Sequence, residues 1–130
     1  MFASSKMSKS LVAAAVLMLA VALAPAGLAK HGDVLVRGTC TSSSMSKLKL
    51  SREDGRVEVE FEVDQNRTGV TWRIVLTRNG TRVFRGARTT RPPSGSFSLR
   101  RVVGDTPAAD RFRARATSPS GEACTASGSF

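Results

Sequence analysis

The chain has 130 residues, a formal net charge of +10, two cysteines, one histidine, one tryptophan and no tyrosine. This length suits one ordinary domain and excludes a multidomain assembly. Two cysteines and one histidine also exclude a multi-cysteine metal scaffold and most histidine-based catalysis.

Residues 1–29 are predicted to be a secretory signal peptide. Two lysines precede an unbroken apolar run over 11–24, and small residues follow it up to Ala29. The run is shorter than the roughly 20 apolar residues that a membrane-spanning helix needs, so an uncleaved anchor is the weaker alternative. We expect cleavage near Ala29, no membrane span after cleavage, and a secreted domain over 30–130 that is extracellular or associated with the cell wall.

Cys40 and Cys124 are expected to form the one disulfide. An exported chain meets an oxidising environment, and two cysteines allow a single intramolecular pairing. The bridge would join the beginning of the domain to its end, and closing so long a loop stabilises by roughly 4 kcal/mol in the chain-entropy model. Two thiols and the distant His31 are too few for a zinc site, so no metal and no cofactor is predicted.

Alternation of apolar and polar residues dominates the chain after residue 30, and no useful stretch has the helical period. The first predicted strand spans 34–40. A hairpin follows, in which strands around 48–50 and 57–63 flank the turn signal Asp54-Gly55. Its lysines and glutamates alternate on the outer face, where cross-strand pairs contribute roughly 0.2–1 kcal/mol each. Glutamates that point into water do not predict a catalytic carboxylate pair.

A second hairpin is predicted around Asn79-Gly80, the strongest short turn signal in the chain. The strand 70–78 turns Trp72 and every second neighbour toward the core, and the return strand runs over about 81–90. Two registers are open for the return strand. A plain two-residue loop leaves Phe84 outside.

A bulged turn instead places Phe84 inside, opposite Ile74, and burial of a phenylalanine at roughly 1.5–3 kcal/mol favours it. In either register one arginine, Arg85 or Arg82, is expected in an unfavourable position.

The C-terminal part of the chain supplies the remaining predicted strands. A loop over 91–95 leads to a strand over 97–103, and a second loop leads to a strand over 111–116 in which arginines alternate with Phe112 and two alanines. Cys124 lies on the closing strand. Seven or eight short strands joined by turns predict an all-β protein with an antiparallel immunoglobulin-like β-sandwich, and a small closed barrel is the alternative.

Several segments spread over the mature chain carry a resemblance: Gly38-Thr39-Cys40, Val57-Glu58-Val59-Glu60-Phe61-Glu62-Val63-Asp64, Thr71-Trp72 and Glu122-Ala123-Cys124-Thr125. With the export segment, they resemble small secreted immunoglobulin-like or fibronectin-type-III-like β-sandwich proteins of high-G+C Gram-positive bacteria. The resemblance implies a fold and no catalytic motif. Antibody-type domains link two central strands through their disulfide, whereas these cysteines lie near the domain ends.

The arginines are the one feature that indicates a partner. Fifteen of the 18 basic residues after position 29 are arginine. The predicted anion-binding residues alternate along candidate strands and are Arg73, Arg82, Arg85, Arg111, Arg113 and Arg115. Arg100 and Arg101 are expected near the last three. Such a surface suits an anionic cell-envelope polymer or an extracellular protein.

Specific nucleic-acid recognition is not predicted, because aromatic residues for base stacking are missing among the arginines. We expect a secreted, non-enzymatic and monomeric domain with no catalytic residue. The alternative hypothesis is an inhibitor of an extracellular hydrolase that presents the loop from Arg88 to Gly95, with its paired prolines, to the enzyme.

Overall fold

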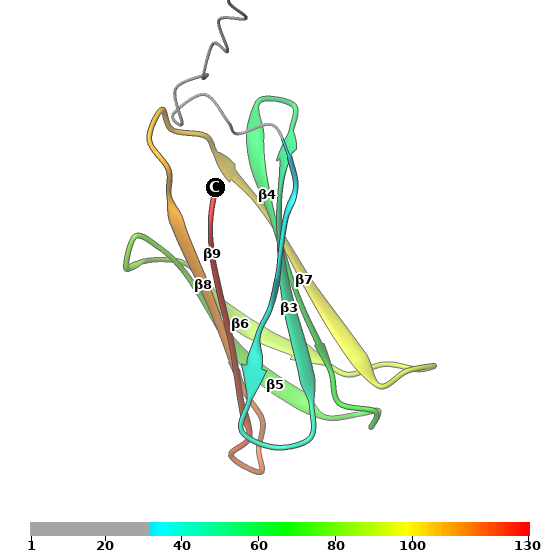
Figure 1. The fold of residues 1–130 in the computed structure, drawn as a ribbon. Helices are drawn as coiled ribbons and strands as arrows, with labels where there is room; N and C mark the ends of the chain where they lie inside the picture. Colours follow the sequence, from blue (N-terminus) through cyan, green and yellow to red (C-terminus); the bar gives the residue numbers. More distant parts are fainter. Residues whose placement is uncertain (1–31) are drawn as a thin grey trace, which may run out of the picture.

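Two antiparallel sheets pack face to face in the computed structural model, which describes residues 32–130 (Figure 1). The predicted signal peptide and His31 lie outside the described residues. Over 32–130 the chain forms strands and no helix, so no helix there could cross a membrane. The predicted all-β sandwich with one disulfide is confirmed, with nine strands in place of seven or eight.

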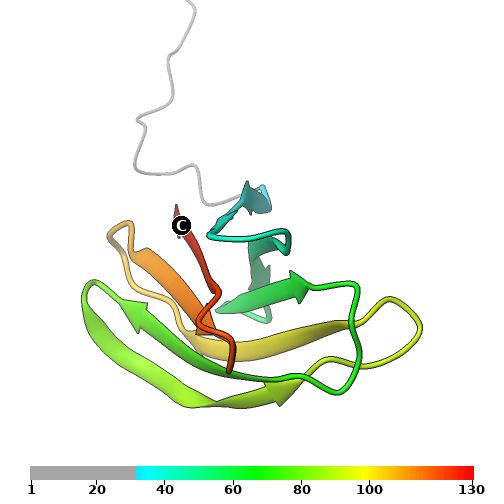
Figure 2. The same cartoon turned by 90° about the horizontal axis from the view of Figure 1, so that it is seen from below.

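The sheets differ in size (Figures 1 and 2). The four-stranded sheet has the order β1-β3-β4-β7, with strands β1 (Val34–Arg37), β3 (Met45–Glu53), β4 (Arg56–Asp64) and β7 (Ser96–Gly104). The five-stranded sheet has the order β2-β9-β8-β5-β6, with strands β2 (Thr39–Cys40), β5 (Thr71–Arg78), β6 (Thr81–Thr89), β8 (Arg111–Thr117) and β9 (Ala123–Ser129).

The core lies between the sheets and is built from every second side chain of the long strands. Phe61, Trp72 and Phe112 are completely buried there, and each comes from a strand in which apolar and polar residues alternate. The Trp72 indole N–H donates to the side-chain oxygen of Gln65 at 3.1 Å, so the buried ring keeps a hydrogen-bond partner. The predicted core role of Trp72 is therefore confirmed.

The ninth strand arises because the predicted strand 34–40 divides at Gly38. Before Gly38 the chain pairs with β3 in the four-stranded sheet, and after it the chain pairs with β9 in the other sheet. The Gly38 N–H donates to the Ser46 carbonyl at 2.9 Å. A Cβ at this position would lie 2.2 Å from the Ser46 hydroxyl oxygen and 2.6 Å from the Thr125 carbonyl oxygen, so only glycine fits.

The β5–β6 hairpin combines the predicted Asn79-Gly80 turn with a β-bulge. Leu76 pairs with Phe84 and the next pair along β5 skips one residue of β6, so Val83 is the extra residue. Phe84 packs against the core, as predicted, but its partner is Leu76 and not Ile74. The bulge shifts the alternation of β6 by one residue.

Both arginines of this part of β6 point outward. Arg82 pairs with Thr77 and Arg85 pairs with Val75, which are outer-face positions of β5, and both arginines are exposed. The expectation that Arg82 or Arg85 would be in an unfavourable position is wrong. The extra residue between them allows both to reach solvent while Phe84 stays inside.

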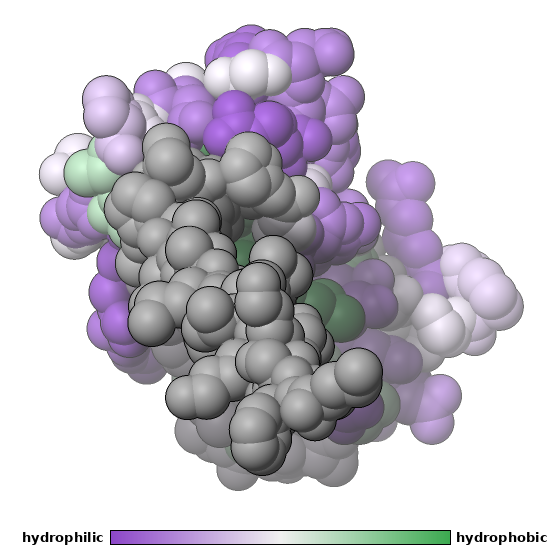
Figure 3. All heavy atoms as spheres, turned by 45° about the horizontal axis from the view of Figure 1, so that its top comes forward, coloured by the Kyte–Doolittle hydropathy of each residue, from purple (hydrophilic) through white to green (hydrophobic). Residues whose placement is uncertain are grey.

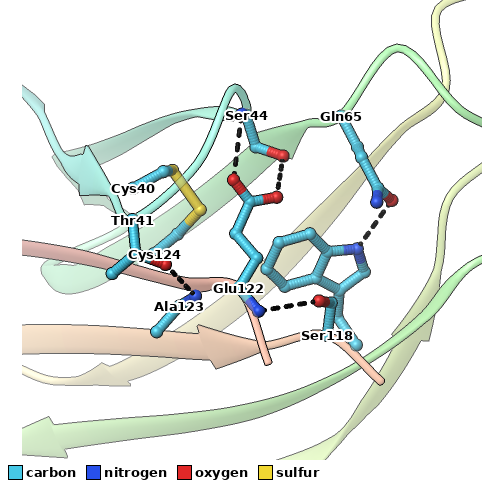
Figure 4. Close-up of a disulfide and its surroundings, with 9 residues drawn as sticks. Cys40, Thr41, Ser44, Gln65, Ser118, Glu122, Ala123 and Cys124 are labelled. Carbon is cyan, nitrogen blue, oxygen red and sulfur yellow. Dashed lines mark hydrogen bonds between the residues drawn. A yellow bond between two sulfur atoms is a disulfide. The ribbon is translucent and has the colours of Figure 1, made fainter. Parts of the chain in front are cut away.

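The disulfide joins Cys40 and Cys124, which are direct cross-strand partners on β2 and β9 with their Cα atoms 4.0 Å apart. The predicted bridge is confirmed, and it lies within one sheet. Figure 4 shows the hydrogen bonds around it, including the carboxylate of Glu122, which accepts from both the backbone N–H and the hydroxyl of Ser44. Bridge and carboxylate together hold the loop after β2 against the start of β9.

Candidate anion-binding face

The outer face of the five-stranded sheet carries all six of the predicted anion-binding arginines. We call this surface the basic face; its arginines come from β5, β6 and β8 and are Arg73, Arg82, Arg85, Arg111, Arg113 and Arg115. All six are exposed. The sequence prediction therefore brought together residues that do share a surface.

Among residues 32–130, no carboxylate lies on the sheet face that carries these arginines. Outer positions between and beside them on the sheet hold small or hydroxyl-bearing residues, among them Thr39, Val75, Thr77, Ala87, Thr117, Ala123, Thr125 and Ser127. Within residues 32–130, none of the six guanidinium groups forms an ion pair. The face therefore concentrates positive charge without an internal counter-charge.

The outer face of the four-stranded sheet has a different character, because carboxylates lie among its basic residues and several of them form ion pairs. Lys47 lies opposite Glu62 and contacts it at 3.6 Å, which confirms the predicted lysine–glutamate pairing across the first hairpin. Arg100 contacts Glu58 at 2.8 Å. The exposed Lys47–Glu62 pair contributes little to stability, but the carboxylates offset part of the positive charge of this face.

Arginines of β6 and β8 form two parallel walls along β5. Arg82 and Arg113 lie on either side of Thr77, and Arg85 and Arg115 lie on either side of Val75. Neighbouring strands are about 4.8 Å apart, so the two walls stand about 10 Å apart at the backbone. Below, "wall arginines" means these four residues.

The two walls border a channel that runs along β5, and the remaining two arginines of the basic face lie at its ends. Arg73 is the outer-face residue of β5 just before Val75, and Arg111 is the outer-face residue of β8 just before Arg113. The backbone N–H of Arg111 donates to the Asn79 side chain at 2.8 Å. Same-face residues on a strand repeat about every 7 Å. The face thus presents four successive rows of positive charge.

Two shallow hollows lie beside Val75 on this face. One measures about 490 Å³ and is lined by Arg73, Arg82 and Arg85 with the small residues between them. The other measures about 630 Å³ and is lined by Thr77, the Asn79-Gly80 turn and the three arginines of β8. Val75 lines both hollows and is 37% exposed, so the floor between the walls is uncharged and partly apolar.

Large apolar side chains are rare elsewhere on the surface of the described residues. Besides Val75, Leu35 and Met45 are the exposed large hydrophobics of residues 32–130. Among the described residues that are visible in the view of Figure 3, most are hydrophilic and the hydrophobic ones show only in small areas. The basic face is therefore set apart by its charge and not by apolar area.

Arg100 and Arg101 do not join the basic face, and their expected place near the β8 arginines is wrong. Both belong to β7, which pairs with β4 in the other sheet. Arg100 hydrogen-bonds Glu58 and thereby lowers the pKa of that carboxyl, whereas a hydrogen bond with Glu58 raises the pKa of Glu53. Glu58 is only 13% exposed, so this glutamate does not point freely into water as expected.

Arg101 lies instead at the edge of the sandwich where β6 and β7, the edge strands of the two sheets, are neighbours. Its guanidinium carbon is 5.3 Å from the centre of the Phe84 ring, and that of Arg88 is 5.4 Å from the same ring. Arg88 takes the inner-face position opposite Trp72 but remains exposed. The two cations stack on an aromatic ring at the sandwich edge and lie outside the basic face.

Arg78 has a structural role that the sequence did not indicate. Its guanidinium donates to the buried carboxylate of Asp110, which also accepts from the Asn79 side chain at 2.8 Å and from the Thr106 hydroxyl at 2.6 Å. The hydrogen bond from Arg78 is the main cause that lowers the pKa of Asp110 to about 2. This carboxylate ties the β7–β8 loop to the turn of the β5–β6 hairpin, next to one end of the basic face.

The loop of the inhibitor hypothesis connects β6 to β7. Residues 91–94 are exposed, and backbone hydrogen bonds hold the loop at its base: the Arg91 N–H donates to the Ser96 carbonyl, and the Gln65 N–H donates to the Gly95 carbonyl. Arg88 and Thr89 belong to β6. A hollow of about 440 Å³ beside the paired prolines also includes Glu62.

Over residues 32–130 the structure contains no cluster of three or more potential metal-ligating side chains. Comparison of the chain with models of known protein families, with curated proteins and with solved structures found no match in any of the three.

Proposed function

We propose that this protein is a secreted, non-enzymatic binding domain that attaches to anionic polymer through the basic face. One observation carries the proposal: six exposed arginines from three strands share one sheet face that holds no carboxylate. A set of like charges without counter-charges stores electrostatic repulsion that a bound polyanion relieves. The extended sheet supplies a broad surface, as a polymer requires, and not an enclosed pocket.

Other features support an extracellular setting for this binding. A cross-strand disulfide is compatible with an oxidising compartment, and the sequence begins with a predicted signal peptide. The small secreted β-sandwich proteins that the sequence resembles are also extracellular, although fold alone does not supply function. The partner we propose is an anionic polymer of the cell envelope.

The test is salt-dependent retention on immobilised heparin, used as a generic polyanion. The wild-type protein should elute above physiological salt. The variant R111Q/R113Q/R115Q should elute at clearly lower salt, because each lost contact with a polyanion reduces the salt dependence of binding by roughly 0.7–0.9 in log–log slope. The control R37Q/R56Q removes two exposed arginines of β1 and β4 and should elute close to wild type.

Two results would contradict the proposal. Passage of the wild-type protein through the column at low salt would show that the face does not hold polyanions. An equal fall in the eluting salt concentration per arginine removed, in the β8 variant and in the control, would show that only net charge matters. Thermal unfolding of each variant checks that the fold is retained.

The inhibitor hypothesis stays a second candidate, because the exposed 91–94 loop is held at its base by backbone hydrogen bonds. A rigid exposed loop is what a protein inhibitor presents to an enzyme cleft. Secreted proteases and glycosidases should then lose activity at micromolar inhibitor concentration, and R91A should abolish the effect. No inhibition across such a panel removes this candidate.

A further inference from the structure

We propose that the basic face holds a single extended chain of a phosphodiester-linked polyol along β5, with two successive phosphates each between arginines of the two walls and with Arg73 and Arg111 beyond them. This inference rests on the proposed function and names the ligand class for the same surface. It follows from the spacing of the wall arginines, from the floor between them and from the position of charge in such a polymer.

The pitch of the arginine rows matches the repeat of such a chain. Arg82 and Arg113 form one row across Thr77, and Arg85 and Arg115 form the next row across Val75, about 7 Å farther along the strand. Two peptide residues contain six backbone bonds and span about 7 Å when extended. A glycerol-type phosphodiester also has six bonds between successive phosphorus atoms, so its extended repeat has nearly the same length.

The two-walled arrangement favours an anion that lies within the polymer backbone. A phosphodiester has two non-bridging oxygens that point to opposite sides of its chain. With arginines on both sides of β5, each oxygen meets a guanidinium from a different strand, and charge-assisted hydrogen bonds of this type are the strong ones. A carboxylate or sulfate hangs from one side of its polymer and reaches one wall only.

The floor of the channel suits an aliphatic backbone. Val75 is 37% exposed between the walls, and Thr77 continues the same uncharged line along β5. Methylene groups of a polyol can contact these side chains while the phosphates reach the arginines above them. In the described part of the chain, no acidic residue on this face would repel the bound polymer.

The same surface does not favour nucleic acid as its occupant. Recognition of single strands relies on aromatic side chains on which bases stack, and the basic face has none. Phe84, the aromatic residue of β6, points inward. Bases would therefore gain no stacking contact on this face, and a polymer without bases can make the same contacts with its arginines.

The experiment measures binding of fluorescently labelled glycerol-phosphate oligomers of increasing length to the complete secreted protein by anisotropy, over a range of salt concentrations. The affinity should rise about tenfold or more as the oligomer grows to span the four rows of arginines, and only slightly with further length. A glutamate oligomer of equal charge, whose same-side carboxylates have a similar pitch, should bind about tenfold more weakly. Oligothymidylate of equal charge should bind no tighter than the glycerol-phosphate oligomer.

Variants then test the two-walled geometry. R82Q and R113Q remove the two sides of one row, and the double variant should lose less affinity than the sum of the single losses if both arginines hold the same phosphate. V75D places a carboxylate on the floor and should abolish binding. T71D introduces the same charge on β5 beyond the walls and should reduce binding much less.

The results separate failure of this inference from failure of the proposed function. Retention on heparin together with equal affinity for phosphodiester and carboxylate oligomers would overturn the ligand class and leave polyanion binding intact. Tighter binding of oligothymidylate would also overturn it. Failure of heparin to retain the wild-type protein would overturn both the ligand class and the proposed function.

Discussion

Arg82 and Arg85 lie on the same face of β6 although two residues separate them, because Val83 between them forms a β-bulge. In a regular strand of this register Phe84 would point outward and Arg85 would take the inner position opposite Ile74. The bulge therefore does two things at once. It places the phenylalanine against the core, and it completes one wall of arginines on the basic face.

Deletion of Val83 should be tolerated. Without this residue, the Asn79-Gly80 turn would lead into a regular strand in which Phe84 still pairs with Leu76 and both arginines still point outward. Val83 is half-buried, so lost contacts should cost about 1–2 kcal/mol of unfolding free energy. Thermal and urea unfolding measure this cost, and heparin retention should stay close to wild type. Loss of retention in a folded deletion variant would mean that the register has been assigned wrongly.

Gly86 is predicted to resist any side chain, for a reason of packing. The Phe84 ring covers it, and a Cβ at Gly86 would lie 2.7 Å from the tip of that ring. G86A should displace the phenylalanine and lower the unfolding free energy by about 1–3 kcal/mol. The matched control is G104A at the end of β7, where a Cβ would meet nothing within 4 Å. Equal stability of the two variants would contradict the packing of Phe84 over Gly86.

Much of the sandwich could be predicted because its signals are local. Alternation identified the inner faces of β4 and β5, and the Asp54-Gly55 and Asn79-Gly80 turns were identified from residues that accept positive φ angles. Alternation on β8 also placed three arginines on one face correctly. Each of these features is set by a few consecutive residues.

Features that depend on distant partners were missed. Arg100 is close in sequence to β8, yet β7 pairs with β4 in the other sheet, so the arginine faces Glu58. The need for glycine at position 38 comes from the nearby Thr125 carbonyl and Ser46 hydroxyl, and the role of Arg78 depends on Asp110. No local pattern reports such contacts, because periodicity gives the face of a strand and not its neighbours.

The disulfide should stabilise the domain without contributing to binding. C40A/C124A, or reduction of the wild-type protein, should lower the unfolding free energy by about 2–5 kcal/mol, since the bridge closes a loop of 84 residues. The six arginines of the basic face come from β5, β6 and β8, and none comes from the bridged strands β2 and β9. Heparin retention at 25 °C should therefore survive while the melting temperature falls. Loss of retention in a protein that is still folded would show that β2 and β9 contribute to the face.

Asp110 should be an acid-sensitive point of the fold. Its carboxylate accepts hydrogen bonds from Arg78, Asn79 and Thr106, and D110N would leave the mostly buried Arg78 guanidinium without its counter-charge. We expect a loss of about 2–4 kcal/mol at neutral pH. The control D54N changes an exposed turn residue that forms no ion pair within residues 32–130 and should be close to neutral.

The pH dependence of this loss follows from the lowered pKa of Asp110. Folding holds the pKa at about 2, below the ordinary value of 3.8, so the unfolded chain takes up a proton first as the pH falls. The contribution of the carboxylate is thus complete above about pH 5 and disappears as the pH drops through about 2. Urea unfolding of wild type and D110N should therefore show a stability difference that is constant at neutral pH and narrows below pH 4. A difference that stays unchanged down to pH 2 would mean that the carboxylate charge does not hold the β7–β8 loop against the hairpin.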